Sequence, residues 1–196
     1  MSAHTVACFR QDHLPCLLLL LTVCLQPMDN FFRTAGFPES VIESCVVAYE
    51  KRFASECAVK PFAGIESMLR SVADQVPCVI VSSNTAANVR AGLGPEMSAC
   101  FKFIDGIDNA PADKARAIAA ALARLGVAPG AACYVGDTRK DAAKAKEAGV
   151  RFIGVDYGFE ALAKDRSAVY GAPVAEDVDE LKALLVGMVG AGPGPG

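Results

Sequence analysis

The chain has 196 residues, of which 53% are apolar and 21% are charged, and its net charge is −3. These values are typical of one globular domain with a buried core and room for a small appendage, and they exclude a disordered chain. Because no basic stripe is visible, neither a nucleic acid nor an acidic membrane surface is expected as a partner. The eight cysteines are scattered and form no CxxC pair. We therefore expect reduced, buried thiols in a cytosolic protein rather than a zinc site.

A strongly apolar run begins at Leu14 and ends at Leu25. It is too short to span a bilayer comfortably, and no small-residue cleavage site follows it. Three interpretations stay open: a buried strand, a signal or anchor segment, and an incorrectly assigned start of the chain. The strand is slightly favoured because the rest of the chain looks cytosolic. A cytoplasmic location is the prediction, and membrane association through this run is the alternative.

The remaining elements alternate along the chain. Apolar residues at helical spacing predict helices over residues 38–53, 64–73, 111–125 and 177–185, another that starts at Thr85, and another between Gly136 and Gly149. Short apolar runs predict buried strands over residues 78–81, 101–104, 132–135 and 152–155. This alternation predicts an α/β fold: a three-layer, Rossmann-like, doubly wound parallel sheet. The Gly- and Pro-rich end, residues 190–196, is predicted to be disordered.

Asp137 and Asp141 form the most informative motif. Asp137 follows the predicted strand at its carboxyl end, and Asp141 lies in the first turn of the next helix. Open α/β sheets bind ligands at this edge. Two carboxylates in one crevice repel each other unless a cation lies between them, and Mg²⁺ prefers such oxygen ligands. Helix capping is an equally good explanation of this pair taken alone.

Two other segments carry groups that could bind an anion. Ser82 ends its strand, and its hydroxyl together with the amides of Ser83 and Asn84 predicts an anion cradle at a helix start. Lys114 lies in the first turn of its helix, where a cation opposes the helix dipole, so a nearby anion or carboxylate is expected. An N-cap and an ordinary solvated lysine are the alternatives for Ser82 and Lys114.

In this chain order, a strand ending in Ser82, Lys114 at a helix start and the Gly136-Asp137-xxx-Asp141 turn resemble the haloacid dehalogenase-like hydrolases. Residues 79–85 (VIVSSNT) and 134–141 (YVGDTRKD) look like the phosphatase branch, phosphoglycolate phosphatase-like members included. The resemblance implies four regions. They are an atypical apolar segment at 1–27, a short, partial helical cap at 28–61, the α/β core at 62–187, and a disordered tail at 188–196.

The resemblance also implies roles for these residues. Ser82 and Lys114 would be catalytic, and Ser83 and Asn84 would join them in holding the phosphate. Asp137 would be a ligand of a Mg²⁺ cofactor, with Asp141 as a further ligand or as support for the first. The implied substrate is a small phosphorylated metabolite, and the oligomeric state stays open. Transfer of a phosphoryl group needs in-line positioning and compensation of negative charge, which these groups would supply.

One motif of the family is not found. Its phosphatases begin with a strand that leads into Asp-x-Asp-Gly-Thr, whose first Asp is the covalent nucleophile. Neither Asp12, Asp29 nor Asp74 has an acid two residues later. We therefore expect phosphatase activity to be reduced or absent in this chain, since losing a nucleophile commonly removes several orders of magnitude of rate. We also expect the run around residues 17–25 to act as a substitute central strand. A non-catalytic phosphate- or metal-binding protein and a membrane-tethered domain are the alternative functions.

Overall fold

The structure, a computed structural model, describes residues 19–21, 29, 32–33, 35–56, 61–111 and 113–190. Within these residues the strands form one six-stranded sheet in the order β3-β2-β1-β4-β5-β6. Its strands are β1 (Leu19–Leu21), β2 (Cys78–Val81), β3 (Phe101–Asp105), β4 (Cys133–Gly136), β5 (Arg151–Val155) and β6 (Val174–Ala175). Every neighbouring pair is parallel, which confirms the predicted doubly wound sheet.

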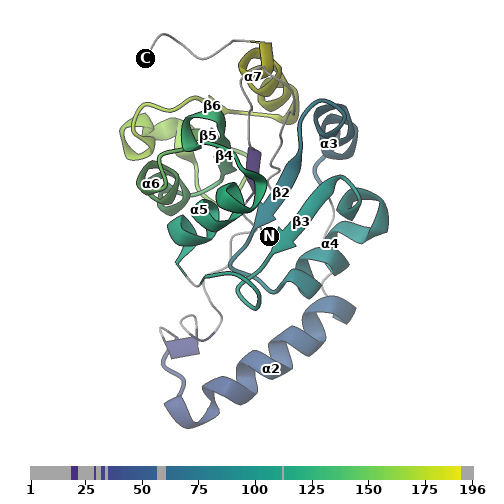
Figure 1. Cartoon of the computed structure of the whole chain (residues 1–196). Helices are drawn as coiled ribbons and strands as arrows, with labels where there is room; N and C mark the ends of the chain where they lie inside the picture. The colour runs from purple at the N-terminus through teal and green to yellow at the C-terminus, as the bar shows by residue number, and fades with distance from the viewer. Residues whose placement is uncertain are drawn as a thin grey trace.

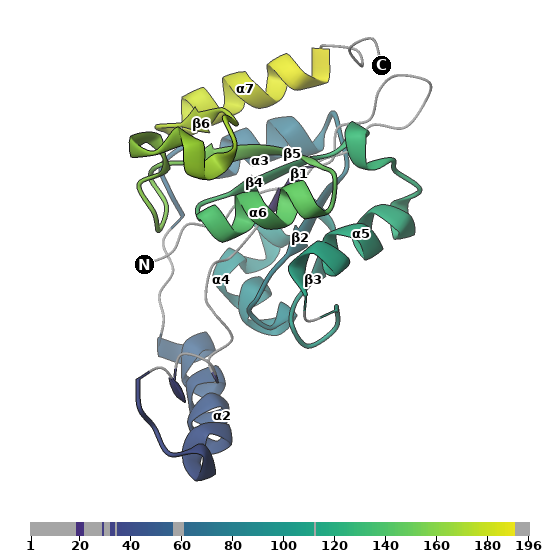
Figure 2. The ribbon, with the colours of Figure 1, turned by 90° about the vertical axis from the view of Figure 1, so that its left-hand side faces the viewer.

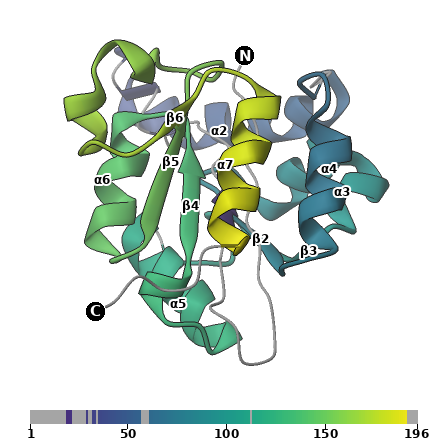
Figure 3. The same ribbon diagram turned by 90° about the horizontal axis from the view of Figure 1, so that it is seen from above.

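Helices cover both faces of the sheet and complete three layers (Figures 1 and 3). On one face lie α5 (Lys114–Leu125) and α6 (Arg139–Glu147), and on the other lie α3 (Ile65–Ala73) and α7 (Val178–Gly190), with α4 (Ala86–Ser98) beside α3. Short 3-10 helices span Pro129–Ala131, Leu162–Lys164 and Arg166–Val169. The long helix α2 (Glu39–Glu56) stands clear of the sheet and contacts α4 (Figure 2).

The core forms because the central strands are apolar on both faces. All four residues of β2 and of β4 are buried, which is the pattern of a parallel strand covered by helices on each side. On α5, small and branched apolar residues at helical spacing face the sheet, and Ile118 is fully buried. Asp113 caps the first turn of α5, and Gly126 ends the helix in the left-handed conformation. Each buried side chain the size of Ile118 contributes about 1.5–3 kcal/mol.

The three described residues of the apolar run form the central strand β1. Leu19 lies beside Cys78 of β2 and Cys133 of β4. The prediction of a central strand within this run is confirmed for Leu19–Leu21, and its role as a substitute stays a prediction. The rest of the run lies outside the described residues, as do residues 191–196 of the predicted tail. Residues 188–190 of that tail form the end of α7, so the expectation of disorder is wrong for them. In the described part of the chain, no helix combines the length and apolar character needed to cross a membrane.

Three further local expectations differ from the structure. Helix α5 begins at Lys114 rather than at residue 111, because Asp113 is its N-cap. Strand β6 was not expected, since two residues are too few to show a periodic pattern. Cys133 is a buried free thiol, as expected, and burial raises its pKa. Cys78, by contrast, is disulfide-bonded, so the expectation of reduced thiols is wrong at that position.

Candidate functional site

The register of the sheet places Ser82 and Asp137 at the same edge. Ile80 of β2 and Val135 of β4 both lie beside Leu21 of β1. Ser82 and Asp137 each come two residues later, so the two strands end at the same level. Because β1 lies between them, their Cα atoms are two strand spacings apart, about 10 Å. This is the carboxyl edge of the sheet, where parallel α/β proteins bind their ligands.

Asp137 is fully buried and only partly hydrogen-bonded. Its Oδ2 accepts a hydrogen bond from the backbone N–H of Phe159 at 3.0 Å. Its Oδ1 is also buried and has no hydrogen-bond partner among the described residues. Burial, and after it the nearby Asp141, raise the pKa of Asp137 to about 6, although the Phe159 N–H acts in the opposite direction. A buried carboxylate oxygen without a donor is costly, and a bound cation would offset that cost.

Asp141 is equally buried, but its two oxygens are both satisfied. Oδ1 accepts from Lys114 Nζ at 2.8 Å and from the Tyr134 hydroxyl at 3.3 Å. Oδ2 accepts from Thr138 Oγ1 at 2.6 Å, and Thr138 Oγ1 accepts from the Asp141 N–H at 3.1 Å. This arrangement favours the supporting role for Asp141 over direct metal ligation. It also orients Lys114, whose side chain is only 15% exposed.

Two members of this network were missed from the sequence. Thr138 caps α6 and stands three residues before Asp141, the spacing of a capping box, so that signal was available. Tyr134 lies inside β4, and no local pattern marks its hydroxyl as a partner of Asp141. Gly136 is required on steric grounds, because a Cβ there would lie 2.5 Å from the Cβ of Asp141.

The loop after β2 is ordered by its own polar side chains. Ser82 Oγ accepts from the N–H of Asn84 at 3.0 Å, so this amide already has a partner within the loop. Asn84 Oδ1 accepts from the Thr85 N–H at 2.8 Å and from Asn88 Nδ2 at 3.1 Å. Because Asn84 Oδ1 accepts both bonds, the other terminal atom of this side-chain amide is Nδ2. Asn84 Nδ2 is a buried donor with no acceptor in the described part of the chain. An anion at this edge would therefore meet Asn84 through its side chain rather than through its backbone amide.

The donor set fits a magnesium ion and a phosphate together. Mg²⁺ is commonly held by one or two carboxylates, with water and phosphate oxygens completing its octahedron. Asp137 Oδ1 offers one such oxygen, while Ser82, Asn84 and Lys114 offer donors to an anion. The described residues contain no group of three or more His, Cys, Asp or Glu side chains that could hold a metal by themselves. A metal that is held partly by protein oxygens and partly by phosphate oxygens needs fewer protein ligands than such a group supplies.

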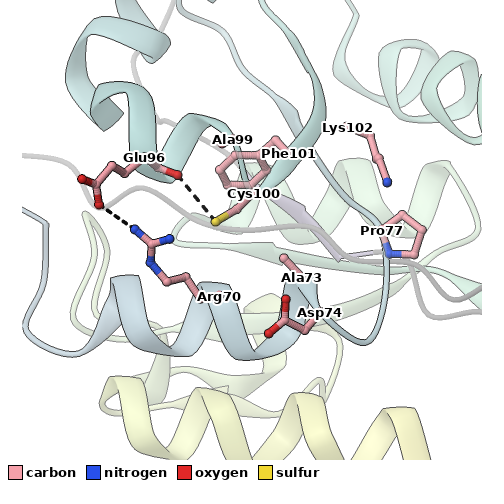
Figure 4. A pocket seen from close by; sticks show the side chains of 9 residues that line it. All are labelled: Arg70, Ala73, Asp74, Pro77, Glu96, Ala99, Cys100, Phe101 and Lys102. Atoms are coloured by element: carbon pink, nitrogen blue, oxygen red, sulfur yellow. Dashed lines mark hydrogen bonds and ion pairs between the residues drawn. The ribbon is translucent and has the colours of Figure 1, made fainter.

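A separate hollow of about 390 Å³ lies between α3 and α4 at the opposite edge of the sheet (Figure 4). Asp74 and Pro77 precede β2, and Cys100 precedes β3, so the hollow is at the amino ends of these strands. Two cations, Arg70 and Lys102, line it, and Arg70 is already paired, at 2.7 Å to Glu96 and 2.9 Å to Glu66. This hollow is therefore not part of the site that contains Ser82 and Asp137.

Comparison with known proteins identifies the family of this chain. Residues 20–155 match the family described as "Haloacid dehalogenase-like hydrolase". The match covers most of the chain, and the chain belongs to this family.

Similar proteins point to one branch of the family. The chain is 30% identical over 142 residues to a phosphoglycolate phosphatase of Caulobacter vibrioides, covering 67% of this chain and 59% of the relative. It is 28% identical over 135 residues to a probable phosphoglycolate phosphatase of Pseudomonas putida, covering 64% of this chain and 50% of the relative. The chain thus spans between half and three-fifths of the length of these relatives. The fold resembles that of a predicted phosphatase from Clostridium acetobutylicum, with a TM-score of 0.67, 24% identity, and coverage of 83% of this chain and 78% of that one.

Proposed function

We propose that this chain binds a small phosphorylated metabolite together with Mg²⁺ at the carboxyl edge of its sheet, as a phosphatase of the phosphoglycolate phosphatase type. The observation that carries the proposal is the buried Oδ1 of Asp137, which has no hydrogen-bond partner among the described residues, beside the Lys114–Asp141 ion pair. A site that served only to cap α6 would leave no carboxylate oxygen without a donor. Similarity to phosphoglycolate phosphatases supports a phosphomonoester as the substrate class.

Each residue has a distinct part in this proposal. Asp137 would hold the metal through Oδ1, and the metal, when bound, supplies positive charge for the phosphate oxygens. Lys114 would compensate negative charge on the same group, in a position fixed by its 2.8 Å contact with Asp141. The Ser82 hydroxyl and Asn84 Nδ2 would donate hydrogen bonds to phosphate oxygens from the other side of β1. Holding the phosphate from two sides restricts its orientation, which is the main requirement of phosphoryl transfer.

The second candidate is a binding protein without efficient hydrolysis. The observation that favours it is the sequence before Ser82, which contains no Asp-x-Asp pair to serve as nucleophile and proton donor. Binding needs only the described groups, whereas a covalent phosphoenzyme needs a carboxylate in addition. This candidate predicts ligand binding with weak or absent turnover.

Two measurements on wild type and Asp137→Ala separate these candidates. The first is hydrolysis of para-nitrophenyl phosphate with Mg²⁺, and the second is thermal stabilisation by Mg²⁺ and inorganic phosphate. Asp74→Asn is the control, because Asp74 is exposed and belongs to the opposite edge. Turnover that Asp137→Ala abolishes supports a phosphatase. Stabilisation without turnover, lost in the same variant, supports a binding protein. A wild type that shows neither response contradicts both.

A further inference from the structure

We propose that Glu160 is a positioning residue, which fastens the loop after β5 against Asp137 so that Oδ1 is the carboxylate oxygen presented to a ligand. The inference deepens the proposed function and rests on it. It assigns a role to residues 158–160, which lie outside the motifs that the sequence singles out. Glu160 acts on Asp137 through the backbone and does not itself contact the ligand in this arrangement.

The 158–160 loop contacts Asp137 at three successive residues. The N–H of Phe159 donates to Asp137 Oδ2 at 3.0 Å, and the N–H of Glu160 donates to the Asp137 carbonyl at 3.1 Å. Gly158 packs so closely that a Cβ there would lie 2.2 Å from the Cβ of Asp137. One bond fixes the carboxylate and the other fixes the backbone that carries it. Together they determine which way Oδ1 points.

The side chain of Glu160 ties this loop to the start of α6. Its Oε2 accepts from the backbone N–H of Arg139 at 3.1 Å, and lies 3.8 Å from the Arg139 guanidinium. Arg139 is the first residue of α6, where N–H groups lack partners inside the helix and a carboxylate is favoured by the helix dipole. Glu160 therefore holds the loop at a point only two residues beyond Asp137.

The consequence is that Glu160 controls the orientation of a ligand-binding oxygen without touching the ligand. Residues that orient a metal-binding carboxylate in this indirect way commonly change metal affinity by about 10- to 100-fold when they are replaced. Phe159 belongs to the same arrangement, because its backbone N–H is hydrogen-bonded to Asp137 although the residue as a whole is 69% exposed. Its amide is thus a direct probe of whether the loop stays in place.

The test compares wild type with Glu160→Ala and Glu160→Gln. The glutamine keeps a side-chain oxygen that can accept from the Arg139 N–H. The matched control is Glu147→Ala, which removes an exposed carboxylate paired with Lys144 at the far end of the same helix. Hydrogen exchange at the Phe159 and Glu160 amides is measured by NMR in metal-free protein. Thermal stabilisation by added MgCl₂ is then measured for each variant.

We expect Glu160→Ala to accelerate exchange at both amides at least tenfold and to raise the half-effective Mg²⁺ concentration about tenfold. Glu160→Gln should stay near wild type in both readouts, and so should Glu147→Ala. Unchanged exchange in Glu160→Ala overturns the fastening of the loop. Faster exchange with an unchanged Mg²⁺ response overturns the positioning role. A wild type that does not respond to Mg²⁺ overturns the proposed function and the metal part of this inference, while the exchange data still decide whether Glu160 fastens the loop.

Discussion

Replacing Asp137 by Asn should change how the stability of the metal-free protein depends on pH. Burial and the neighbouring Asp141 raise the pKa of Asp137 from its ordinary value of 3.8 to about 6. The folded state therefore binds this proton more tightly than the unfolded state does. The stability that the protonated group contributes is fully present below about pH 4 and is lost as the pH rises through about 6.

The size of the effect follows from the two pKa values. At pH 8 the ionised Asp137 lowers the free energy of unfolding by about 3 kcal/mol relative to the protonated group, and at pH 5 by roughly half as much. Asn cannot ionise, so Asp137→Asn lacks this dependence. Any constant cost of placing an amide N–H₂ at the Oδ1 position cancels when the same variant is compared at two pH values. The free energy of unfolding of the variant, minus that of wild type, should therefore grow by about 1 kcal/mol from pH 5 to pH 8.

The measurement is urea unfolding followed by circular dichroism at pH 5, 6, 7 and 8, with EDTA present to keep the protein free of metal. Asp74→Asn controls for the loss of one negative charge at an exposed position. A difference between Asp137→Asn and wild type that stays flat or shrinks as the pH rises would refute the reasoning. It would mean that the carboxylate is already compensated in the folded protein without a cation.

Three further substitutions test the network around this carboxylate and the core that supports it. Lys114→Met should lower the free energy of unfolding by about 3 kcal/mol in urea, since it leaves the buried Asp141 without its cation; a loss below 1 kcal/mol would contradict a buried pair. Gly136→Ala should cost about 3 kcal/mol or prevent folding, because the new Cβ overlaps Asp141, whereas Gly187→Ala, with open space around it on α7, should stabilise the protein by about 0.5 kcal/mol in the same assay. Ile118→Ala should cost about 3 kcal/mol and lower the melting temperature, and a near-neutral result would contradict its place in the core.

The elements that sequence reasoning predicted well are those whose signals are local. Strand β2 is found at Cys78–Val81 as expected, because a continuous apolar run is typical of a strand buried on both faces. Helix α5 follows from Ile118 and Leu122 on one face and from Gly126 at its end. Its first residue was misplaced because an Asp cap and a Pro two residues earlier give competing start signals. Strand β6 pairs only Gly154 with Val174 and Val155 with Ala175, contacts that no local pattern encodes.

In the candidate site, too, the features with local signals could be predicted and the long-range contacts could not. Asp137, Asp141, Ser82 and Lys114 could be placed at one edge because each follows a strand or begins a helix, and parallel strands end on the same side. What could not be predicted is how the two carboxylates differ. That difference depends on Phe159, which is 22 residues from Asp137 in the chain but donates a hydrogen bond to it.

The two carboxylates differ in how many of their oxygens accept hydrogen bonds, and this difference supports the proposed function most strongly. Asp141 and Asp137 are both fully buried, and both lie where α6 begins. If the network existed only to stabilise the fold, each buried oxygen would be expected to have a donor, as both oxygens of Asp141 do. Asp137 instead has one oxygen held by Phe159 and one held by none of the described residues. A ligand that binds only the folded state can offset this cost. Its binding adds stability that rises with the logarithm of ligand concentration. We therefore expect the stability of wild type to rise with Mg²⁺ concentration and the stability of Asp137→Asn to stay constant.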